Sequence, residues 1–500
     1  MSPSGPKRWW SPNTRGSLMV CATSSDAGKS LVVTALCAAL RRQGATVAPF
    51  KGQNMSLNSY VCSDGAEISR AQAAQAMAGG ATPEAAMNPV LLKPTGERHS
   101  QVMVMGQLWA EVDSTSYQSS KASLAPIVDA ALSDIRSRYD VVICEGAGSP
   151  AEINLPGPDL VNLGLAQRGG IDALLVADIE RGGVFASLAG TLDLLSADQR
   201  RLVRAALINK MRGEPELLAP GIAEIERRWP ISFCGILPHL RLGSLDAEDS
   251  LNMGGFPQSK ERARLDVVVI ALPRISNFTD FDALQAEEGV QLRYVNSPAL
   301  FGNPDLVILP GSKATVADLG WLRATGMATA IAQASRRGSS LLGICAGYQM
   351  LGKVIHDGVE SSLGTVAGLG LLDATTRFET AKVTRQRRGS WGEETVSGYQ
   401  IHHGRVVASE EPWLELDDGE KEGAATAGGI WGTTLHGLFE DDGVRNRFLA
   451  EVAQRSAKTW HQSNLKFDAL RKAQWELLAD ALEAHVNLEM LAEIMTGAAG

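Results

Sequence analysis

The sequence predicts an α/β protein with two parallel-sheet domains and a helical C-terminal tail. Short apolar runs rich in Val, Ile and Leu recur along the chain, each followed by a small-residue turn and a helix-like stretch. Apolar strands that alternate with helices are typical of a parallel sheet covered on both faces. This rhythm is interrupted once, and at 500 residues the chain is too long for a single hydrophobic core. Two such domains are therefore expected.

The first series of predicted strands lies in the amino-terminal half of the chain. A helix is predicted over residues 31–42, directly after the first strand. The predicted strands of this series are 17–21, 140–144, 171–177 and 202–208.

A second series follows a stretch that is rich in Asp, Glu, Gly and Pro and poor in long apolar residues, which we interpret as a linker. Its predicted strands are 265–270, 305–309 and 340–344. After about residue 460 apolar residues fall near a 3.6-residue spacing, which predicts a helix. These residues are Phe467, Leu470, Ala473, Leu477, Leu478 and Leu482.

Five segments are expected along the chain. They are an N-terminal extension (1–16), a first α/β domain (17–243), a linker (244–264), a second α/β domain (265–460) and a helical tail (461–500).

Composition excludes several classes of protein. The 47 basic and 56 acidic side chains give a net charge of −9, and the basic residues are scattered, which argues against a nucleic-acid partner. No apolar run approaches the roughly 20 residues that span a bilayer, and residues 1–10 lack the apolar core of a secretory signal. The six cysteines form no CxxC pair, which argues against a zinc site or a disulfide framework. We expect a cytoplasmic enzyme with no membrane partner, and a homo-oligomer is left open.

A phosphate-binding loop is predicted between the first strand and the helix that follows it. Gly28 would let backbone N–H groups approach phosphate oxygens, Lys29 would reach the β- and γ-phosphates, and Ser30 would bind Mg²⁺ at the helix N-terminus. Thr23 stands where the strict GxxxxGK[ST] pattern has glycine, so the prediction depends on the strand–loop–helix context. A chance turn is the alternative.

Other polar residues are candidates for the same site. Glu145 ends a predicted strand, and ligands of open α/β sheets bind at the carboxyl ends of the strands, where this carboxylate could hold Mg²⁺. Lys51 follows an apolar segment and is a second candidate for binding phosphate. Asp64 and Glu67 are further Mg²⁺ candidates, although acidic residues in a polar loop are usually only solvated.

A nucleophile elbow is predicted at Cys345, directly after a predicted strand. Gly343 and Gly347 flank this cysteine and permit a sharp strand-to-helix turn, and the helix N-terminus favours the reactive thiolate. A structural cysteine more often lies within a strand without flanking glycines, as Cys21 and Cys144 do. We therefore interpret Cys345 as a catalytic nucleophile.

A cysteine nucleophile needs a base, and His436 is the best candidate because a short strand delivers it to a turn. His402 and His403 compete for this role, or could serve as substrate contacts or polar core residues. The backbone N–H groups of Gly311 and Ala346 are predicted to form an oxyanion hole.

Together these stretches resemble the cobyric acid synthases of cobalamin biosynthesis. One matching segment, APFKGQNMSLNS at 48–59, separates this family from the related a,c-diamide synthases. The resemblance covers roughly residues 17 to 450. The other matching segments are 67–72, 87–94, 145–154, 181–185, 272–280 and 309–313, together with the elbow at Cys345.

The resemblance implies a P-loop NTPase domain similar to dethiobiotin synthetase, joined to a class I glutamine amidotransferase domain of flavodoxin-like fold. It further implies ATP as co-substrate with Mg²⁺, and glutamine and a corrinoid acid as substrates. The implied reaction amidates the b, d, e and g carboxylates of (adenosyl)cobyrinic acid a,c-diamide through an acyl phosphate. Leu438 stands where ordinary class I amidotransferases carry the glutamate that orients the histidine, so another group must hold the tautomer of His436.

Two alternatives remain. The chain could be an amidotransferase ligase for a different acceptor, such as cobyrinic acid itself or a nucleotide. It could also be a regulatory P-loop ATPase with an inactive amidase domain, although the intact Cys345 and His436 count against this interpretation.

Overall fold

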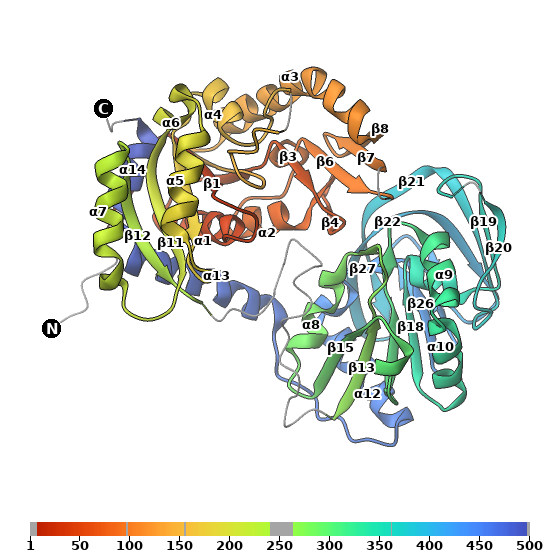
Figure 1. Ribbon diagram of the computed structural model, residues 1–500. Helices are drawn as coiled ribbons and strands as arrows, with labels where there is room; N and C mark the ends of the chain where they lie inside the picture. Colours follow the sequence, from red (N-terminus) through yellow and green to blue (C-terminus); the bar gives the residue numbers. More distant parts are fainter. Residues whose placement is uncertain (1–7, 97–98, 155–156, 241–263, 362, 498–500) are drawn as a thin grey trace.

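The computed structural model describes residues 8–96, 99–154, 157–240, 264–361 and 363–497 (Figure 1). Nearly all of the predicted linker, 244–263, lies outside the described residues. Two α/β domains lie side by side, and the predicted fold class of two parallel-sheet domains with a helical tail is confirmed.

The first domain is built on a six-stranded sheet of order β12-β11-β10-β1-β9-β2, in which every strand pair is parallel. Alternate residues of its central strands enter two different core clusters, so both faces of the sheet are buried, as the apolar runs predict. The strands are β1 (Gly16–Ala22), β2 (Val47–Phe50), β9 (Val141–Glu145), β10 (Ala173–Asp178), β11 (Val203–Met211) and β12 (Ser232–Pro238).

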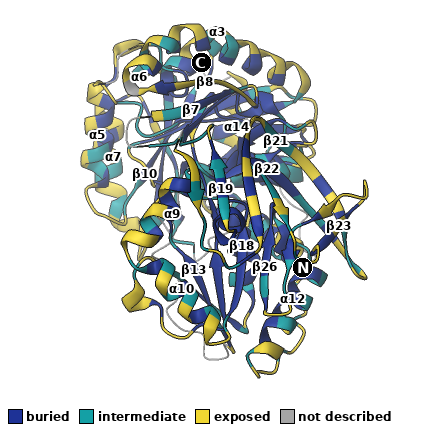
Figure 2. Ribbon diagram, turned by 90° about the vertical axis from the view of Figure 1, so that its right-hand side faces the viewer, coloured by how far each residue is buried: buried dark blue, intermediate teal, exposed yellow. Residues whose placement is uncertain are grey.

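Helices cover both faces of this sheet (Figure 1). They are α1 (Lys29–Arg42), α2 (Arg70–Ala78), α3 (Ser114–Arg138), α4 (Leu163–Gly169), α5 (Val184–Leu194), α6 (Ala197–Leu202) and α7 (Ala219–Arg228). The outward faces of α3, α5, α6 and α7 are exposed, whereas α1 and α2 have no exposed residue (Figures 1 and 2). The segment between β2 and α3 adds a four-stranded sheet and a hairpin on the side that faces the second domain. These strands are β3 (Gln53–Met55), β6 (Val90–Pro94), β7 (His99–Val104) and β8 (Gln107–Asp113), with β4 (Ser59–Val61) and β5 (Glu67–Ser69) in the hairpin.

The second domain contains a sheet of order β15-β13-β16-β18-β26-β25, parallel except for its last pair. Its strands are β13 (Leu265–Ile270), β15 (Val290–Val295), β16 (Leu306–Leu309), β18 (Ser340–Ile344), β25 (Ala424–Ala425) and β26 (Ile430–Thr433). Its helices are α8 (Asp282–Ala286), α9 (Thr315–Ala324), α10 (Met327–Arg336), α11 (Ala346–Leu351) and α12 (Asp442–Arg455).

A second, mostly antiparallel sheet in this domain was not predicted from the sequence. Its two long central strands form an extensive antiparallel pair. The strands are β19 (Val354–Asp357), β20 (Gly364–Ala367), β21 (Ala374–Trp391), β22 (Glu394–Ala408), β23 (Leu414–Leu416), β24 (Lys421–Glu422) and β27 (Leu435–His436).

The helical tail packs against the first domain, although it follows the second in sequence (Figure 1). It consists of α13 (Phe467–His485) and α14 (Leu488–Thr496). Arg42 of α1 donates to Glu476 and Asp480 of α13 at 2.6 and 2.7 Å. The predicted apolar stripe is wrong in part, because Ala473 and Leu477 are exposed. The buried residues of α13 are Phe467, Arg471, Trp475, Leu478, Ala479 and Leu482.

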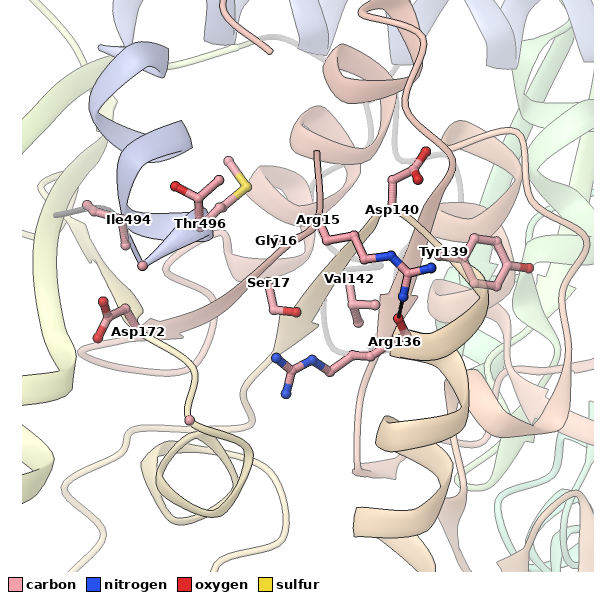
Figure 3. A pocket seen from close by; sticks show the side chains of 13 residues that line it. Arg15, Gly16, Ser17, Arg136, Tyr139, Asp140, Val142, Asp172, Ile494 and Thr496 are labelled. Carbon is pink, nitrogen blue, oxygen red and sulfur yellow. Dashed lines mark hydrogen bonds between the residues drawn. The ribbon is translucent and has the colours of Figure 1, made fainter. Parts of the chain in front are cut away.

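Helix α14 ends beside the amino end of β1, where it forms one wall of a pocket (Figure 3). The opposite wall carries Arg15, whose guanidinium donates to the carbonyl of Arg136 at 3.4 Å. Ligands of open parallel sheets bind at the carboxyl ends of the strands, so this pocket lies at the opposite end from the predicted phosphate loop. Among the described residues, no helix is both long and apolar enough to cross a bilayer.

Candidate active sites

The predicted phosphate loop connects β1 to α1. Gly28 has φ of 100°, in the left-handed region, and an added Cβ would lie 2.1 Å from Nδ2 of Asn209. Asn209 itself donates to the carbonyl of Ala27 at 2.9 Å, so this wall cannot move away freely. Only glycine fits both the backbone and the space at this position. The first amides of α1 are thereby placed beside the loop, an arrangement that suits an anion.

Lys29 lies across the mouth of this loop. Its ammonium donates to the carbonyls of Ser24, at 3.2 Å, and Gly148, at 3.0 Å. The residue is buried, and its charge is held between the loop and the segment that follows β9. A cation in this place can neutralise phosphate oxygens bound at the amino end of α1.

Two predicted residues, Ser30 and Lys51, meet the carboxylate of Glu145 at the carboxyl end of β9, and Gln75, which was not predicted, joins them. Ser30 Oγ and Lys51 Nζ both donate to Glu145 Oε1 at 2.9 Å, and Gln75 Nε2 donates to Oε2 at 2.5 Å. Glu145 is fully buried, and these donors satisfy it. A hydroxyl beside a carboxylate fits the hard oxygen ligands that Mg²⁺ prefers. No cluster of three His, Cys, Asp or Glu ligands occurs in the described part of the chain, so phosphate oxygens would complete such a site.

Asp64 and Glu67 do not join this group. Asp64 is exposed in the turn between β4 and β5, where its carboxylate accepts from the amide of Ala66 at 3.0 Å. The hairpin packs against the second domain, since Gln386 donates to the carbonyl of Val61. Glu67 is buried and pairs with two lysines at the domain interface.

The elbow at Cys345 has the predicted form. Cys345 has φ of 52° and ψ of −108°, a strained conformation between β18 and α11. An added Cβ would lie 2.6 Å from Tyr348 Cα at Gly343, and 1.9 Å from the Leu309 carbonyl oxygen at Gly347. Both flanking glycines are therefore required by close backbone packing. The turn presents the thiol at the carboxyl end of the parallel sheet.

His436 is held by a carboxylate that the sequence analysis did not identify. Asp280 Oδ2 lies 2.7 Å from His436 Nδ1, and Oδ1 accepts from the amide of Gly437 at 2.8 Å. The ring of Tyr399 stacks on the imidazole with centroids 5.4 Å apart. Burial alone would lower the pKa of His436, but the charge and hydrogen bond of Asp280 and the nearby Cys345 thiol raise it above its ordinary value. Cys345, His436 and Asp280 thus form a triad-like site.

Asp280 is the carboxylate that orients His436, which the apolar Leu438 cannot do. It lies in a short 3₁₀ helix, Phe278–Phe281, directly after β14 (Ile275–Ser276). The segment 272–280 was singled out in the sequence only as a matching stretch, and nothing local relates it to a histidine 156 residues later. An acid between two aromatic residues, Phe278 and Phe281, is the one signal that could have identified it, because buried carboxylates require a partner.

His402 and His403 are placed differently. His402 Nδ1 lies 2.7 Å from the carbonyl of Gly404, and burial lowers its pKa to about 3. His403 Nδ1 lies 3.0 Å from the carbonyl of Glu379, and burial also lowers its pKa. Both therefore stay neutral near pH 7, and both line the pocket beside Cys345. This geometry suits substrate contacts rather than the base.

The two predicted oxyanion-hole residues lie near the triad. Ala346 is the first residue of α11, directly after Cys345. Gly311 belongs to β17 (Gly311–Ser312), and an added Cβ there would lie 3.0 Å from His436 Cε1. A side chain at this position would press on the imidazole, so glycine leaves room for the ring of His436.

Comparison with known proteins extends the similarity over both domains. Residues 18–249 match the family described as the CobQ/CobB/MinD/ParA nucleotide binding domain, and residues 266–444 match the CobB/CobQ-like glutamine amidotransferase domain. A cobyric acid synthase of Nocardia farcinica (strain IFM 10152) is 46% identical over 97% of this chain and 98% of its own length. One of Rhodococcus jostii (strain RHA1) is 46% identical over 96% of each chain. The similarity therefore runs through nearly the whole sequence.

Proposed function

From the premise that the chain belongs to the cobyric acid synthase family, a carbon–nitrogen ligase with glutamine as amide donor, we propose its acceptor and mechanism. The acceptor is (adenosyl)cobyrinic acid a,c-diamide, and its b, d, e and g carboxylates are amidated to give (adenosyl)cobyric acid. The single observation that best supports this two-part reaction is the presence of a Cys345–His436–Asp280 site and a Ser30–Lys51–Glu145 site in one chain.

The second domain releases ammonia from glutamine. The thiolate of Cys345 attacks the carboxamide carbon, and His436 donates a proton to the departing ammonia. The amides of Gly311 and Ala346 stabilise the oxyanion that forms on the carboxamide oxygen. Water then attacks the thioester, which releases glutamate and restores the thiol. Asp280 fixes the tautomer of His436 and stabilises its protonated form in these steps.

The first domain activates the acceptor. A carboxylate of the corrinoid attacks the γ-phosphate of ATP to give an acyl phosphate and ADP, and ammonia then displaces phosphate to form the amide. Lys29 and Lys51 offset the charge that develops on the phosphate oxygens. Ser30 and Glu145 would hold Mg²⁺, which supplies further charge neutralisation when bound. A carboxylate needs this activation because oxide is a poor leaving group.

A steady-state assay with candidate acids tests the proposal. Glutamate and ADP are measured with ATP and glutamine, with and without (adenosyl)cobyrinic acid a,c-diamide or cobyrinic acid. We expect both products to rise with the a,c-diamide and four amide groups to be added, as followed by mass spectrometry. Faster turnover with cobyrinic acid than with the a,c-diamide would mean that cobyrinic acid is the acceptor. Glutamine-independent ADP release with every acid would favour a regulatory ATPase instead.

A further inference from the structure

The pocket beside Cys345 is lined by residues of both domains. Most of its walls come from the second domain, including Lys313 of the β17 turn and Lys382 of β21. Lys93, at the end of β6, comes from the nucleotide-binding domain and lines the same pocket. The cavity that opens on the nucleophile is therefore incomplete without the other domain.

Buried hydrogen bonds fix this arrangement. The amide of Ser59 in β4 donates to Asn277 Oδ1 at 3.3 Å, and its carbonyl accepts from the hydroxyl of Tyr399 at 2.9 Å. Thr279 Oγ1 donates to Asn58 Oδ1 at 3.1 Å. All of these residues are buried. The contacts hold the hairpin of the first domain against the residues next to Asp280 and above His436.

Lys93 is positioned by the same hairpin. Its ammonium donates to Ser59 Oγ at 2.9 Å and to one carboxylate oxygen of Glu67. The second oxygen of Glu67 accepts from Lys382, so this carboxylate joins a lysine of each domain. Lys93 is 4% exposed and Glu67 is fully buried. The ammonium is thus held at the pocket wall with little freedom.

Buried charges of both signs surround the pocket. Lys93, Lys313 and Lys382 line it, Glu67 pairs with Lys93 and Lys382, and Glu360 and Glu111 lie near Lys313. Lys313 Nζ is 3.9 Å from Glu360, too far for a hydrogen bond, and one carboxylate oxygen of Glu360 is buried without a hydrogen-bond partner among the described residues. Burial, with Lys382 and Lys313 close by, lowers the pKa of Lys93 to about 8. A buried ammonium that makes no hydrogen bond to the carboxylate beside it, next to a carboxylate oxygen without a partner among the described residues, suits a zwitterion.

We propose that Lys93 and Lys313 bind the α-carboxylate of glutamine and that Glu360 binds its α-ammonium group. The nucleotide-binding domain thereby completes the glutamine pocket of the other domain, and Glu67 acts as the positioning residue for Lys93. This inference rests on the proposed function only for the identity of the bound amino acid.

The test compares glutamine with L-glutamine α-amide, which lacks the α-carboxylate. Glutamate or isoglutamine formation is measured for wild type, Lys93→Met and Lys93→Arg with ATP and the corrinoid acid present. Wild type should prefer glutamine, and Lys93→Met should raise the KM for glutamine roughly 30-fold or more with a smaller change in kcat. The KM for the α-amide should barely change. Lys93→Arg should recover part of the preference.

Matched controls keep the result clear. Lys353→Met removes an exposed lysine paired with Asp373 and should leave both KM values unchanged. If Lys93→Met does not fold, Lys93→Gln takes its place, because it removes the charge but keeps a donor for Ser59 and Glu67, and Glu67 stays paired with Lys382. An unchanged KM for glutamine, or an equal rise for both substrates, overturns the assignment. Ammonium-supported amidation is followed in parallel: its absence in wild type with every corrinoid acid would contradict the proposed function, while glutamine hydrolysis still reports on Lys93.

Discussion

The two active sites are assembled differently. At the proposed nucleotide site, Ser30, Lys51 and Glu145 all come from the first domain, and their mutual hydrogen bonds lie within it. At the proposed glutaminase site, Cys345, His436 and Asp280 belong to the second domain, but Tyr399 over His436 bonds to Ser59 of the first. The residue that stacks on His436 is therefore held in part by the first domain.

The largest expected effect separates the two sites chemically. Cys345→Ser should abolish glutamine-supported amidation, a loss of at least about 10⁴-fold, because the nucleophile is removed. Activity with high ammonium salt should persist, since the nucleotide site remains intact. Amide formation from each nitrogen source checks this. Loss of both activities would mean that Cys345 is structural or that the two sites cannot be separated.

The converse change acts on the nucleotide site. Lys29→Ala should lower ADP formation and all amidation by about 10³-fold, because one of the two lysine charges near the phosphates is lost. Basal glutamine hydrolysis should continue at some level. Glu145→Gln should act mainly by weakening the Mg²⁺ dependence. The prediction is contradicted if Lys29→Ala releases ADP at a near-normal rate and Glu145→Gln keeps an unchanged Mg²⁺ response. The nucleotide would then bind at a site other than the loop between β1 and α1.

Within the glutaminase site, Asp280→Asn should lower glutamine hydrolysis about 10²-fold, because an amide neither fixes the required tautomer nor stabilises protonated His436. His402→Ala and His403→Ala should be milder than His436→Ala, since each of these rings bonds a backbone carbonyl through Nδ1, whereas His436 is held by Asp280 and hydrogen-bonds Cys345. Initial rates of glutamate formation test the order. A more severe defect in His403→Ala than in His436→Ala would mean that His403 is the base.

The same pair predicts a pH dependence of stability. Asp280 raises the pKa of His436 in the folded state, so this pair contributes stability fully below the ordinary histidine pKa and loses it as pH rises through the raised value. The unfolding free energy of wild type should therefore exceed that of Asp280→Asn, and the difference should be largest below about pH 6.5. Urea denaturation of both proteins from pH 6 upward measures the difference. A gap that widens with rising pH would contradict this assignment.

Substitutions in the helical tail should change stability and have the smallest effect on catalysis. Trp475→Ala removes a buried ring from the cluster shared by α13 and α1, and should cost about 3–5 kcal/mol. Leu477→Ala, at a side chain 48% exposed on the same helix, should change stability by less than about 0.5 kcal/mol. Thermal unfolding distinguishes them. Equal effects would mean that the buried face of α13 is not the one described.

The features that could be predicted from the sequence are those set by residues close together along the chain. The central strands, the loop at Gly28 and the elbow at Cys345 carry local signals, namely apolar runs and glycines at close backbone contacts. Asp280 was missed because its partner is brought near only by the fold. Residues 374–408 were missed as strands because most of β21 is exposed or half-buried and lacks an apolar run. In α13, Arg471 is buried by pairing with Glu440, which a hydrophobic pattern cannot reveal.

The position of α13 and α14 has a consequence for how the protein is made. The first domain leaves the ribosome first, yet the two helices that cover α1 and the amino end of β1 are translated after every other described element. Until they emerge, the nascent first domain carries an open apolar face, the kind of surface that recruits chaperones or aggregates. Loss of the codons for α13 and α14 would therefore damage a domain encoded far upstream of them, by leaving the nucleotide-binding domain unfinished.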